Sequence, residues 1–230
     1  MNSLYDFIVE PLGDKYSNTV KVGDKELVVN TKIENFKFVN RLAKVVKTPL
    51  AFNLNIKIGD IVVVHQNVFR VFYDMRGEKK KSRSFFKDDL YFCAIDQVYL
   101  YKNENGWNTV GDRCFIKPIK SNQSLTVDKE RSLVGILRYG NSSLNDLEIN
   151  PGDLVGYTPK GEWEFLVEKE RLYCMKSNDI VIKYGNKENQ TEYNPSWANS
   201  SAGIDKSSTR ADCRHGGGCV CGPTEERSCH

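Results

Sequence analysis

The residues with the most evident chemistry are cysteines and histidines crowded near the end of the chain. The stretch "CRHGGGCVCGPTEERSCH" holds Cys213, His215, Cys219, Cys221 and Cys229, followed by His230. Thiolates and imidazoles bind soft ions such as zinc or copper(I), and a flexible glycine-rich segment can wrap such an ion without a preformed site. The spacing matches no familiar zinc finger, because Cys-x-Cys replaces Cys-x2-Cys. Three interpretations stay open: a zinc-binding tail, disulfide or redox chemistry, and an unstructured end.

Enzymatic chemistry has few candidates in the rest of the chain. We find no P-loop, dinucleotide-binding glycine motif, zincin motif or nucleophile elbow. His65 ends an apolar run, where a hydrogen-bonded structural role is expected sooner than that of a base. Three further cysteines also lie in apolar runs, as buried and reduced thiols do: Cys93, Cys114 and Cys174. We therefore expect a protein that is not an enzyme and requires no cofactor.

The charge balance restricts the classes of partner. The chain has 33 basic and 30 acidic residues, a formal net charge of +3, which is too small to attract nucleic acid or an anionic membrane. Its first residues, "MNSLYDFIVEPLGD", lack a basic start and a long apolar run. No stretch approaches the roughly 20 apolar residues that span a bilayer. We expect a cytoplasmic protein that binds neither nucleic acid nor membrane.

The segments that must position any functional residue occur in two similar series. "NIKIGDIVVVH" and "LEINPGDLVGYT" share a Gly-Asp turn before an apolar run. Three flanking pairs keep the same order: "FIVEPL" with "FIKPI", "RLAKVVKT" with "SLVGILRYG", and "DDLYFCAIDQVYLYK" with "ERLYCMKSNDIVIKY". Four blocks repeated in one order predict a tandem duplication, with units at residues 1–105 and 110–186.

Each unit consists of short β-branched or aromatic runs separated by Gly, Asn, Asp or Pro turns. This pattern predicts an all-β fold of two small, partly open β-barrels. The first unit has an insertion at residues 71–89 that predicts a protruding hairpin with a basic tip at residues 79–83. From residue 187 to 230 the composition becomes polar, which predicts a disordered tail, with Tyr193 and Trp197 as its candidate contacts with the fold.

The ordered blocks resemble the GroES-like co-chaperonin family over about residues 5–185. "FIKPI" is similar to the family's opening strand and "LVGILRYG" to its "GxVxxVG"-like strand. "EINPGDLVGYT" and "LYCMKSNDIVIKY" are similar to its "VKxGDxVxF" turn and its closing segment. The first unit departs from the pattern, because Asp96 stands two places before Val98, whereas Asp179 directly precedes Ile180.

The resemblance implies two tandem GroES-like barrels in a homo-oligomeric lid that caps a group I, GroEL-like chaperonin and assists protein folding. It also implies gripping through mobile loops, here residues 13–32 and 120–130. The matching contact residues would be Leu27, Val28, Val29, Leu125, Thr126 and Val127, with Thr126 at a place where an aliphatic residue is usual. Large phages carry such proteins, so the resemblance extends to a phage-encoded co-chaperonin acting in a host cytoplasm.

Two other interpretations of the chain remain. The run "ELVV" can be one more β-strand instead of a mobile contact peptide. In that case the barrels can serve as packing modules of a structural or decoration protein of a virion that binds no chaperonin. A metal-carrying or redox accessory protein is the third class, which co-purification of metal, lost on changing Cys219 and Cys221 to Ser, would identify.

Overall fold

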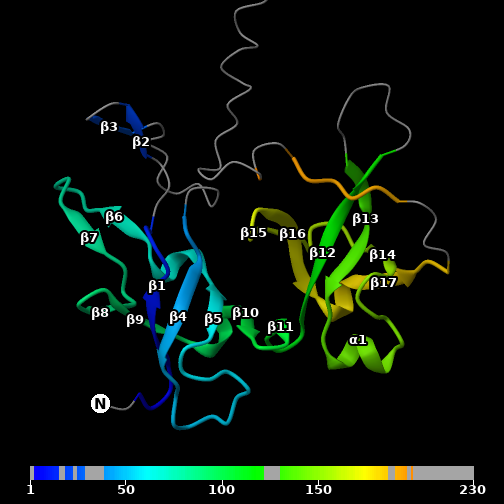
Figure 1. The fold of residues 1–230 in the computed structure, drawn as a ribbon, viewed down its shortest axis with the longest axis horizontal. Coiled ribbons are helices and arrows are strands. Elements are labelled where there is room, and N and C mark those ends of the chain that lie inside the picture. Colours follow the sequence, from blue (N-terminus) through cyan, green and yellow to red (C-terminus); the bar gives the residue numbers. More distant parts are fainter. Residues whose placement is uncertain are drawn as a thin grey trace, which may run out of the picture.

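The computed structural model describes residues 3–15, 19–22, 25–28, 39–121, 130–185, 190–195 and 198. Within these residues the chain is built mostly from β-strands, with one short α-helix, α1 (Ser142–Asp146). The predicted all-β class is therefore confirmed. None of the described helices is long and apolar enough to cross a membrane. Figure 1 shows the strands gathered into two groups that lie side by side along the long axis.

The first group is a seven-stranded antiparallel sheet. Its strands lie in the order β11 (Gly106–Thr109), β10 (Val98–Asn103), β5 (Ile61–Val64), β4 (Leu42–Lys47), β1 (Phe7–Pro11), β9 (Leu90–Cys93) and β8 (Phe85–Lys87). Alternate residues of β1, β4, β5 and β9 face a buried apolar core, as the period-two pattern predicts. Val9, Val62, Val64 and Tyr91 belong to this core.

The second group is a six-stranded antiparallel sheet. Its strands lie in the order β15 (Trp163–Val167), β16 (Glu170–Lys176), β12 (Arg113–Lys120), β13 (Glu130–Tyr139), β14 (Leu154–Tyr157) and β17 (Ile180–Lys183). Helix α1 lies in the connection from β13 to β14, and its buried Leu144 belongs to the core under this sheet.

The two sheets share one topology. In chain order, β1, β4, β5, β9 and β10 of the first sheet correspond to β12, β13, β14, β16 and β17 of the second, and the neighbours in space correspond as well. A one-residue bulge falls at the same place in both sheets. In β4, Val46 is left unpaired between the partners of Ile8 and Val9. In β13, Arg138 is left unpaired between the partners of Phe115 and Ile116. Bulges at equivalent positions are what two copies of one repeat would share.

The two Gly-Asp turns are equivalent at the level of single hydrogen bonds. Gly59 and Gly152 have φ angles of 97° and 92°, in the left-handed region that favours glycine. Each of these glycines donates its N–H to the carbonyl of an equivalent strand residue, Val45 at 2.8 Å and Leu137 at 2.6 Å. The following aspartate accepts from the residue three places before it, with N···O distances of 2.8 and 2.9 Å. These turns therefore set the start of β5 and β14.

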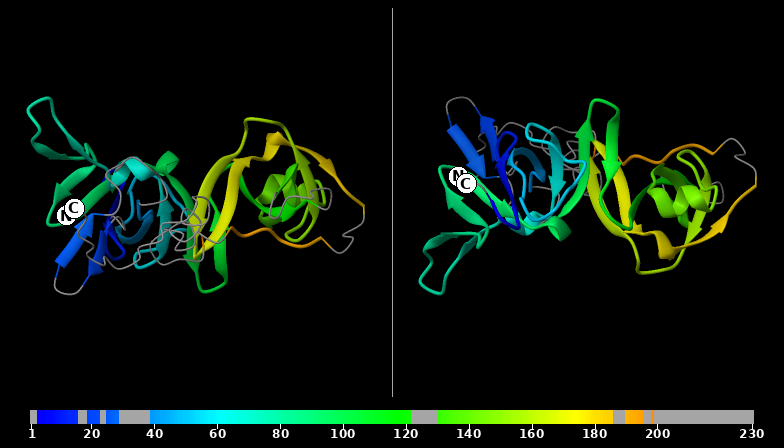
Figure 2. Two further views of the ribbon diagram at one scale, coloured as in Figure 1. Left: turned by 90° about the horizontal axis from the view of Figure 1, so that it is seen from above. Right: turned by 90° about the horizontal axis from the view of Figure 1, so that it is seen from below.

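Neither sheet closes into a barrel within the described residues. The first sheet ends at β11 and β8, and the second ends at β15 and β17. The views from above and below in Figure 2 show the two sheets as separate, strongly twisted layers. The structure thus supports two repeated β-units, while the tandem GroES-like barrels that the resemblance implies are not confirmed.

Two hairpins stand apart from the sheets on the side of the first unit (Figure 1). One pairs β2 (Thr19–Val22) with β3 (Lys25–Val28), and the other pairs β6 (Val71–Tyr73) with β7 (Lys79–Lys81). The second hairpin occupies the insertion, but its tip is the turn from residue 74 to 78 and not the basic run. The carboxylate of Asp74 accepts from the N–H groups of Arg76 and Glu78, both at 2.9 Å, and so places the turn before the lysines.

Part of the segment predicted as a disordered tail is docked on the second sheet. Strand β12 pairs with β16 only as far as Ile116, so the backbone groups of Pro118 and Lys120 are available to another segment. Lys120 N–H donates to Thr191 O, and Tyr193 N–H donates to Pro118 O, both at 2.8 Å. Ala198 is buried. Residues 190–195 therefore extend the fold beyond residue 187, because main-chain hydrogen bonding orders a segment whose composition is polar.

Candidate functional site

The end of β1 and the start of β4 lie at the upper edge in Figure 1, and so do the end of β12 and the start of β13. They follow equivalent positions, since Pro11 pairs with Ala43 and Pro118 pairs with Gly135 at corresponding points of the two sheets. The first connection contains the β2–β3 hairpin. A partner that meets this edge therefore meets equivalent strand ends of both units.

The sequence-predicted contact residues are only partly placed. Leu27 and Val28 lie on β3, where their backbones pair with Val20 and Thr19 of β2. This segment is a hydrogen-bonded strand and not an irregular loop, because alternating residues in both runs suit a hairpin. The other predicted residues lie outside the described ones: Val29, Leu125, Thr126 and Val127, and the metal candidates Cys213, His215, Cys219, Cys221 and Cys229.

Asn40 fixes the base of the first connection. Its side-chain amide donates to Leu12 O at 2.7 Å and Asp14 O at 3.0 Å, and its side-chain oxygen accepts from Leu42 N–H at 3.0 Å. Its own backbone N–H donates to Lys15 O at 2.9 Å. The two ends of the connection are therefore tied together where the chain leaves β1 and where it enters β4. No sequence motif marked this asparagine, although asparagine at a strand entry is typical of such local bonding.

A charged network holds the corresponding end of the second unit. The guanidinium of Arg171 pairs with Glu164 at 2.5 Å and with Glu130 at 2.6 Å. The hydroxyl of Tyr173 accepts from Arg171 at 2.6 Å and donates to Glu130 at 2.7 Å. Burial first, then the hydrogen bond to Glu130, raises the pKa of Tyr173, which keeps it protonated. Glu130 is the first residue of β13, so this network anchors the return of the second connection.

The sheets meet through an apolar joint. Val63, Tyr99 and Leu100 of the first sheet belong to one buried cluster together with residues of the second sheet, namely Phe115, Phe165, Val167, Leu172 and Cys174. The ring centroids of Tyr99 and Phe165 are 4.8 Å apart. Burial of these side chains makes the joint a third core, so the two units are one packed body.

Polar groups at the rim of the joint line a cavity of about 240 Å³ that includes Arg41, His65 and Trp163. The guanidinium of Arg41 lies 4.3 Å from the Phe165 ring centroid, and desolvation lowers the pKa of Arg41 to about 10. His65 Nδ1 accepts from Asn67 N–H at 3.1 Å, as expected of a structural histidine. Burial, followed by the charge of Arg41, lowers the pKa of His65 and favours the neutral ring.

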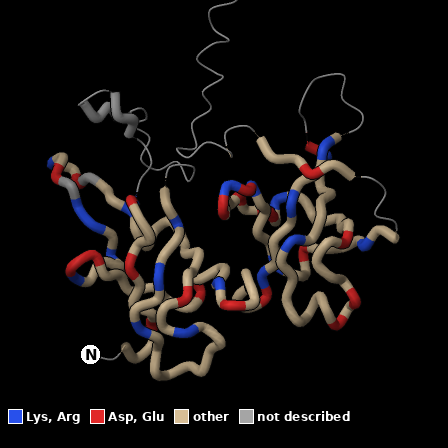
Figure 3. Tube along the Cα trace, in the orientation of Figure 1, with Lys and Arg blue, Asp and Glu red and all other residues tan. Residues whose placement is uncertain are grey.

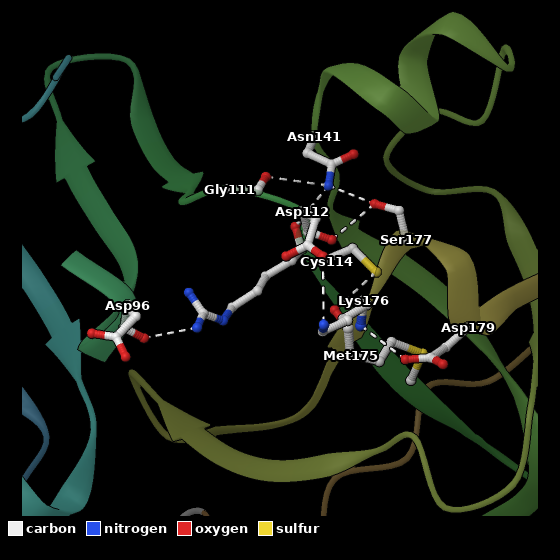
Figure 4. Close-up of polar contacts among 10 residues, drawn as sticks. Asp96, Gly111, Asp112, Cys114, Asn141, Met175, Lys176, Ser177 and Asp179 are labelled. Carbon is white, nitrogen blue, oxygen red and sulfur yellow. Dashed lines mark hydrogen bonds and ion pairs between the residues drawn. The ribbon is translucent and has the colours of Figure 1, made fainter. Parts of the chain in front are cut away.

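The segment that links the two sheets is fixed by hydrogen bonds, and Figure 4 shows all of those described here except the bond to Val98. Arg113 donates to Asp96 O at 2.7 Å and to Val98 O at 3.1 Å. The side-chain amide of Asn141 donates to Arg113 O at 3.2 Å and to the Ser177 hydroxyl at 2.6 Å, and that hydroxyl donates to Asp112 O at 3.0 Å. The linker thus contacts both sheets, which limits their relative motion.

The described cysteines are free and buried, and burial raises the pKa of both Cys114 and Cys174 to about 12. These thiols are protonated at neutral pH, and their burial is what the sequence led us to expect. In the part of the chain that the structure describes, no group of three or more His, Cys, Asp and Glu residues is arranged to hold a metal ion. The C-terminal cysteine and histidine cluster lies outside that part.

The basic stretch of the β6–β7 hairpin lies on the outer side of the first sheet (Figure 3). Lys80 pairs with Glu78 at 2.7 Å and Asp74 at 3.5 Å, and the ammonium group of Lys81 lies 3.6 Å from the Phe85 ring centroid. These local contacts balance much of the charge. We therefore interpret the hairpin as a solvated extension in preference to a binding site for an acidic partner.

The chain matches no family model, and no curated protein sequence matches it. The observations that bear on its function are the repeated fold, the edge where equivalent strand ends of both units lie, and the joint.

Proposed function

We propose that the chain is a co-chaperonin-like protein that caps a chaperonin ring and assists protein folding without a cofactor of its own. The observation that carries the proposal is that two sheets joined by a packed core present equivalent strand ends, those of β1 and β4 and those of β12 and β13, at the same edge (Figure 1). This arrangement suits a protein that holds a larger ring at several points. The action would take place in a cytoplasm, that of the host if a phage encodes the protein.

In this proposal, the joint holds the two chaperonin contacts at a fixed distance from each other. Two weak contacts on one rigid body bind more tightly than either alone, because the second contact forms without a new loss of translational freedom. The β2–β3 hairpin contributes a further mode of recognition. As a two-stranded sheet it has one unpaired edge on each strand within the described residues, and such an edge can add a strand of a partner.

The test is gel filtration of the purified protein with a group I chaperonin, with and without ADP. We expect the two to migrate together in a nucleotide-dependent manner. The variant Leu27→Ser/Val28→Ser/Val29→Ser should abolish migration with the chaperonin. Phe72→Ser on the other hairpin is the matched control and should leave it unchanged, since Phe72 is an exposed apolar residue of the β6–β7 hairpin. Equal loss in both variants would contradict a specific grip at β3.

A structural or decoration protein is the second candidate, and one observation favours it. Residues 25–28 are already paired as a strand, whereas a peptide that orders on a chaperonin would be expected to be irregular when free. If no chaperonin of the host migrates with the protein in either nucleotide state, this second candidate becomes the better proposal. The repeated fold would then serve assembly alone.

A further inference from the structure

We infer that the cavity at the rim of the joint is a binding site for a small aromatic carboxylate. The cavity has a volume of about 240 Å³. Sites for drug-sized ligands span about 300–1,000 Å³, so this one suits a smaller molecule with one ring and one charged group. Such a site goes beyond the proposed function, since its use does not depend on a chaperonin.

Both sheets contribute residues to the wall of the cavity. The first sheet supplies Arg41 directly before β4, His65 directly after β5, and Tyr99 of β10. The second sheet supplies Trp163 and Phe165 of β15. A ligand in this cavity therefore contacts both sheets.

The cation of the site is the guanidinium of Arg41. It donates to the side-chain oxygen of Gln66 at 3.1 Å and lies 4.3 Å from the Phe165 ring centroid, and these contacts fix its position. Desolvation lowers the pKa of Arg41 to about 10, so burial outweighs the attraction of the negative charge around it, and the group is still charged at neutral pH. A carboxylate placed beside this guanidinium would restore part of the lost stabilisation of its charge.

His65 provides a second, neutral donor. Its Nδ1 accepts from Asn67 N–H at 3.1 Å, and a neutral imidazole with that acceptor carries its proton on Nε2. Burial lowers the pKa of His65 most, and the charge of Arg41 lowers it further, so the ring is neutral at pH 7. Within the described residues, Nε2 donates to no group. This N–H can therefore serve an oxygen of a bound carboxylate.

Glu164 also lines the cavity and might be expected to repel an anion. Its carboxylate, however, pairs with the guanidinium of Arg171 at 2.5 Å. This ion pair balances the acidic charge of the wall, so the site retains its preference for an anion.

The aromatic residues of the cavity suit a planar ligand. The rings of Tyr99 and Phe165 are packed together, with centroids 4.8 Å apart, and the ring of His65 is stacked on Tyr99 at 6.1 Å. Trp163 lines the same cavity but is 59% exposed. A large ring left exposed beside a cavity offers its face to a planar molecule by offset stacking. The ring of the ligand is assigned to this face.

The second repeat shows that the fold of a unit does not require the polar and aromatic groups of the cavity. The equivalent registers of β4–β5 and β13–β14, and of β5–β10 and β14–β17, identify the counterparts of Arg41, His65 and Tyr99 as Leu133, Thr158 and Val181. None of these three counterparts is an arginine, a histidine or an aromatic residue. The cation, the imidazole and the ring are therefore features of the joint cavity and not of the repeat.

The test is a titration of the full chain with para-fluorobenzoate, followed by fluorine NMR. We expect a Kd of about 0.1–1 mM, as for other ligands with so few atoms. Para-fluorobenzamide keeps the ring without the charge, and acetate, added as a competitor, keeps the charge without the ring. Each should bind at least about tenfold more weakly than para-fluorobenzoate, because each lacks one of the two contacts.

Two variants separate the contributions of the cation and the ring. Arg41→Met should weaken para-fluorobenzoate about tenfold and leave para-fluorobenzamide nearly unchanged, because only the charged probe uses the guanidinium. Trp163→Ala should weaken both probes. Arg138→Met is the matched control, since the Arg138 guanidinium also lies near an aromatic ring, 6.0 Å from the Tyr139 centroid, but outside the cavity. It should bind both probes as the wild type does.

Each variant must keep the wild-type unfolding midpoint in urea, and Arg41→Gln replaces Arg41→Met if that variant unfolds. If both Arg41 variants unfold, Trp163→Ala and the comparison of the two fluorinated probes still decide, because Trp163 is largely exposed. Para-fluorobenzoate at about 10 mM should also raise the urea midpoint of the wild type, since it binds the folded state, and should not raise that of Trp163→Ala.

Any of three results would overturn the inference: no binding of para-fluorobenzoate up to about 10 mM, equal binding of the benzoate and the benzamide, or an equal loss of affinity in Arg41→Met and Arg138→Met. These measurements contain no chaperonin, so their failure and the failure of the proposed function are scored separately.

Discussion

Gln97 and Asp179 occupy equivalent positions in the two repeats and accept the same hydrogen bond. Ala94 N–H donates to the side-chain oxygen of Gln97, and Lys176 N–H donates to that of Asp179, both at 3.1 Å. Each residue ends a single 3-10 turn that leads into the last shared strand of its repeat. An amide oxygen in one repeat therefore replaces a carboxylate in the other, and Asp96 is not the counterpart of Asp179.

We expect Gln97→Ala and Asp179→Ala each to lower the free energy of unfolding by about 1 kcal/mol, because each removes one side-chain acceptor from a backbone donor. Urea unfolding followed by circular dichroism measures the change. Asp96→Ala is the control and should have a much smaller effect, since the Asp96 contact seen here uses its backbone carbonyl. A cost for Asp96→Ala equal to that for Gln97→Ala would show the equivalence to be wrong.

Gly135→Ala should be among the most destabilising single changes in the second sheet. A Cβ atom there would lie 2.5 Å from the Ile116 side chain and 2.6 Å from Lys117 O, so a neighbouring strand would have to shift. We expect a loss of about 1–3 kcal/mol, as for other overpacked sites. Gly185→Ala is the control, because a Cβ atom at Gly185 meets nothing within 4 Å. Thermal unfolding of the two variants would distinguish a steric cause from a general cost of replacing glycine.

The joint should couple the stabilities of the two sheets through Tyr99 and Phe165. Changing either residue to Ala should lower the free energy of unfolding by about 3–5 kcal/mol, the range for large aromatic side chains in a core. A double-mutant cycle should return a coupling energy of about 0.5–1.5 kcal/mol for the ring pair. Additive effects of the two changes would indicate that the rings do not interact in solution.

Lys117 should make the stability depend on pH in the alkaline range. Burial by itself lowers the pKa of Lys117, but hydrogen bonds to Glu192 and Glu170 outweigh it, so the pKa lies above its ordinary value of 10.5. A raised pKa contributes stability that is fully present below pH 10.5 and is lost as the pH rises through the folded-state value. The free energy of unfolding of the wild type should exceed that of Lys117→Met by about 1–2 kcal/mol at neutral pH.

Urea unfolding at intervals from pH 7 to 11.5 measures this difference. The difference in the free energy of unfolding between wild type and Lys117→Met should be constant up to about pH 10 and then decrease. Lys44→Met is the control for the general effect of removing a lysine, because Lys44 is half exposed and pairs with Glu10 at 3.7 Å. If the difference between wild type and Lys44→Met decreases equally with pH, the pH dependence comes from the overall charge and not from the buried ammonium.

The local features of this fold could be predicted from the sequence because they depend on neighbours along the chain. Alternating apolar residues indicated strands, and Gly59-Asp60 and Gly152-Asp153 indicated turns, since positive φ and an aspartate bonding its own backbone are local requirements. The order of four repeated blocks likewise indicated two equivalent units. The shared topology agrees with that inference down to the bulges.

Tertiary structure decided the features that depend on segments far apart in the chain. Tyr99 packs on Phe165 across the joint, Tyr193 bonds Pro118 beyond the point where β12 and β16 separate, and Gln97 takes the role assigned to an aspartate. No local pattern contains these contacts, because the free energy of burying a face depends on which other face is brought against it. For the same reason, the sequence identified the two units, while only the fold revealed the faces through which they pack.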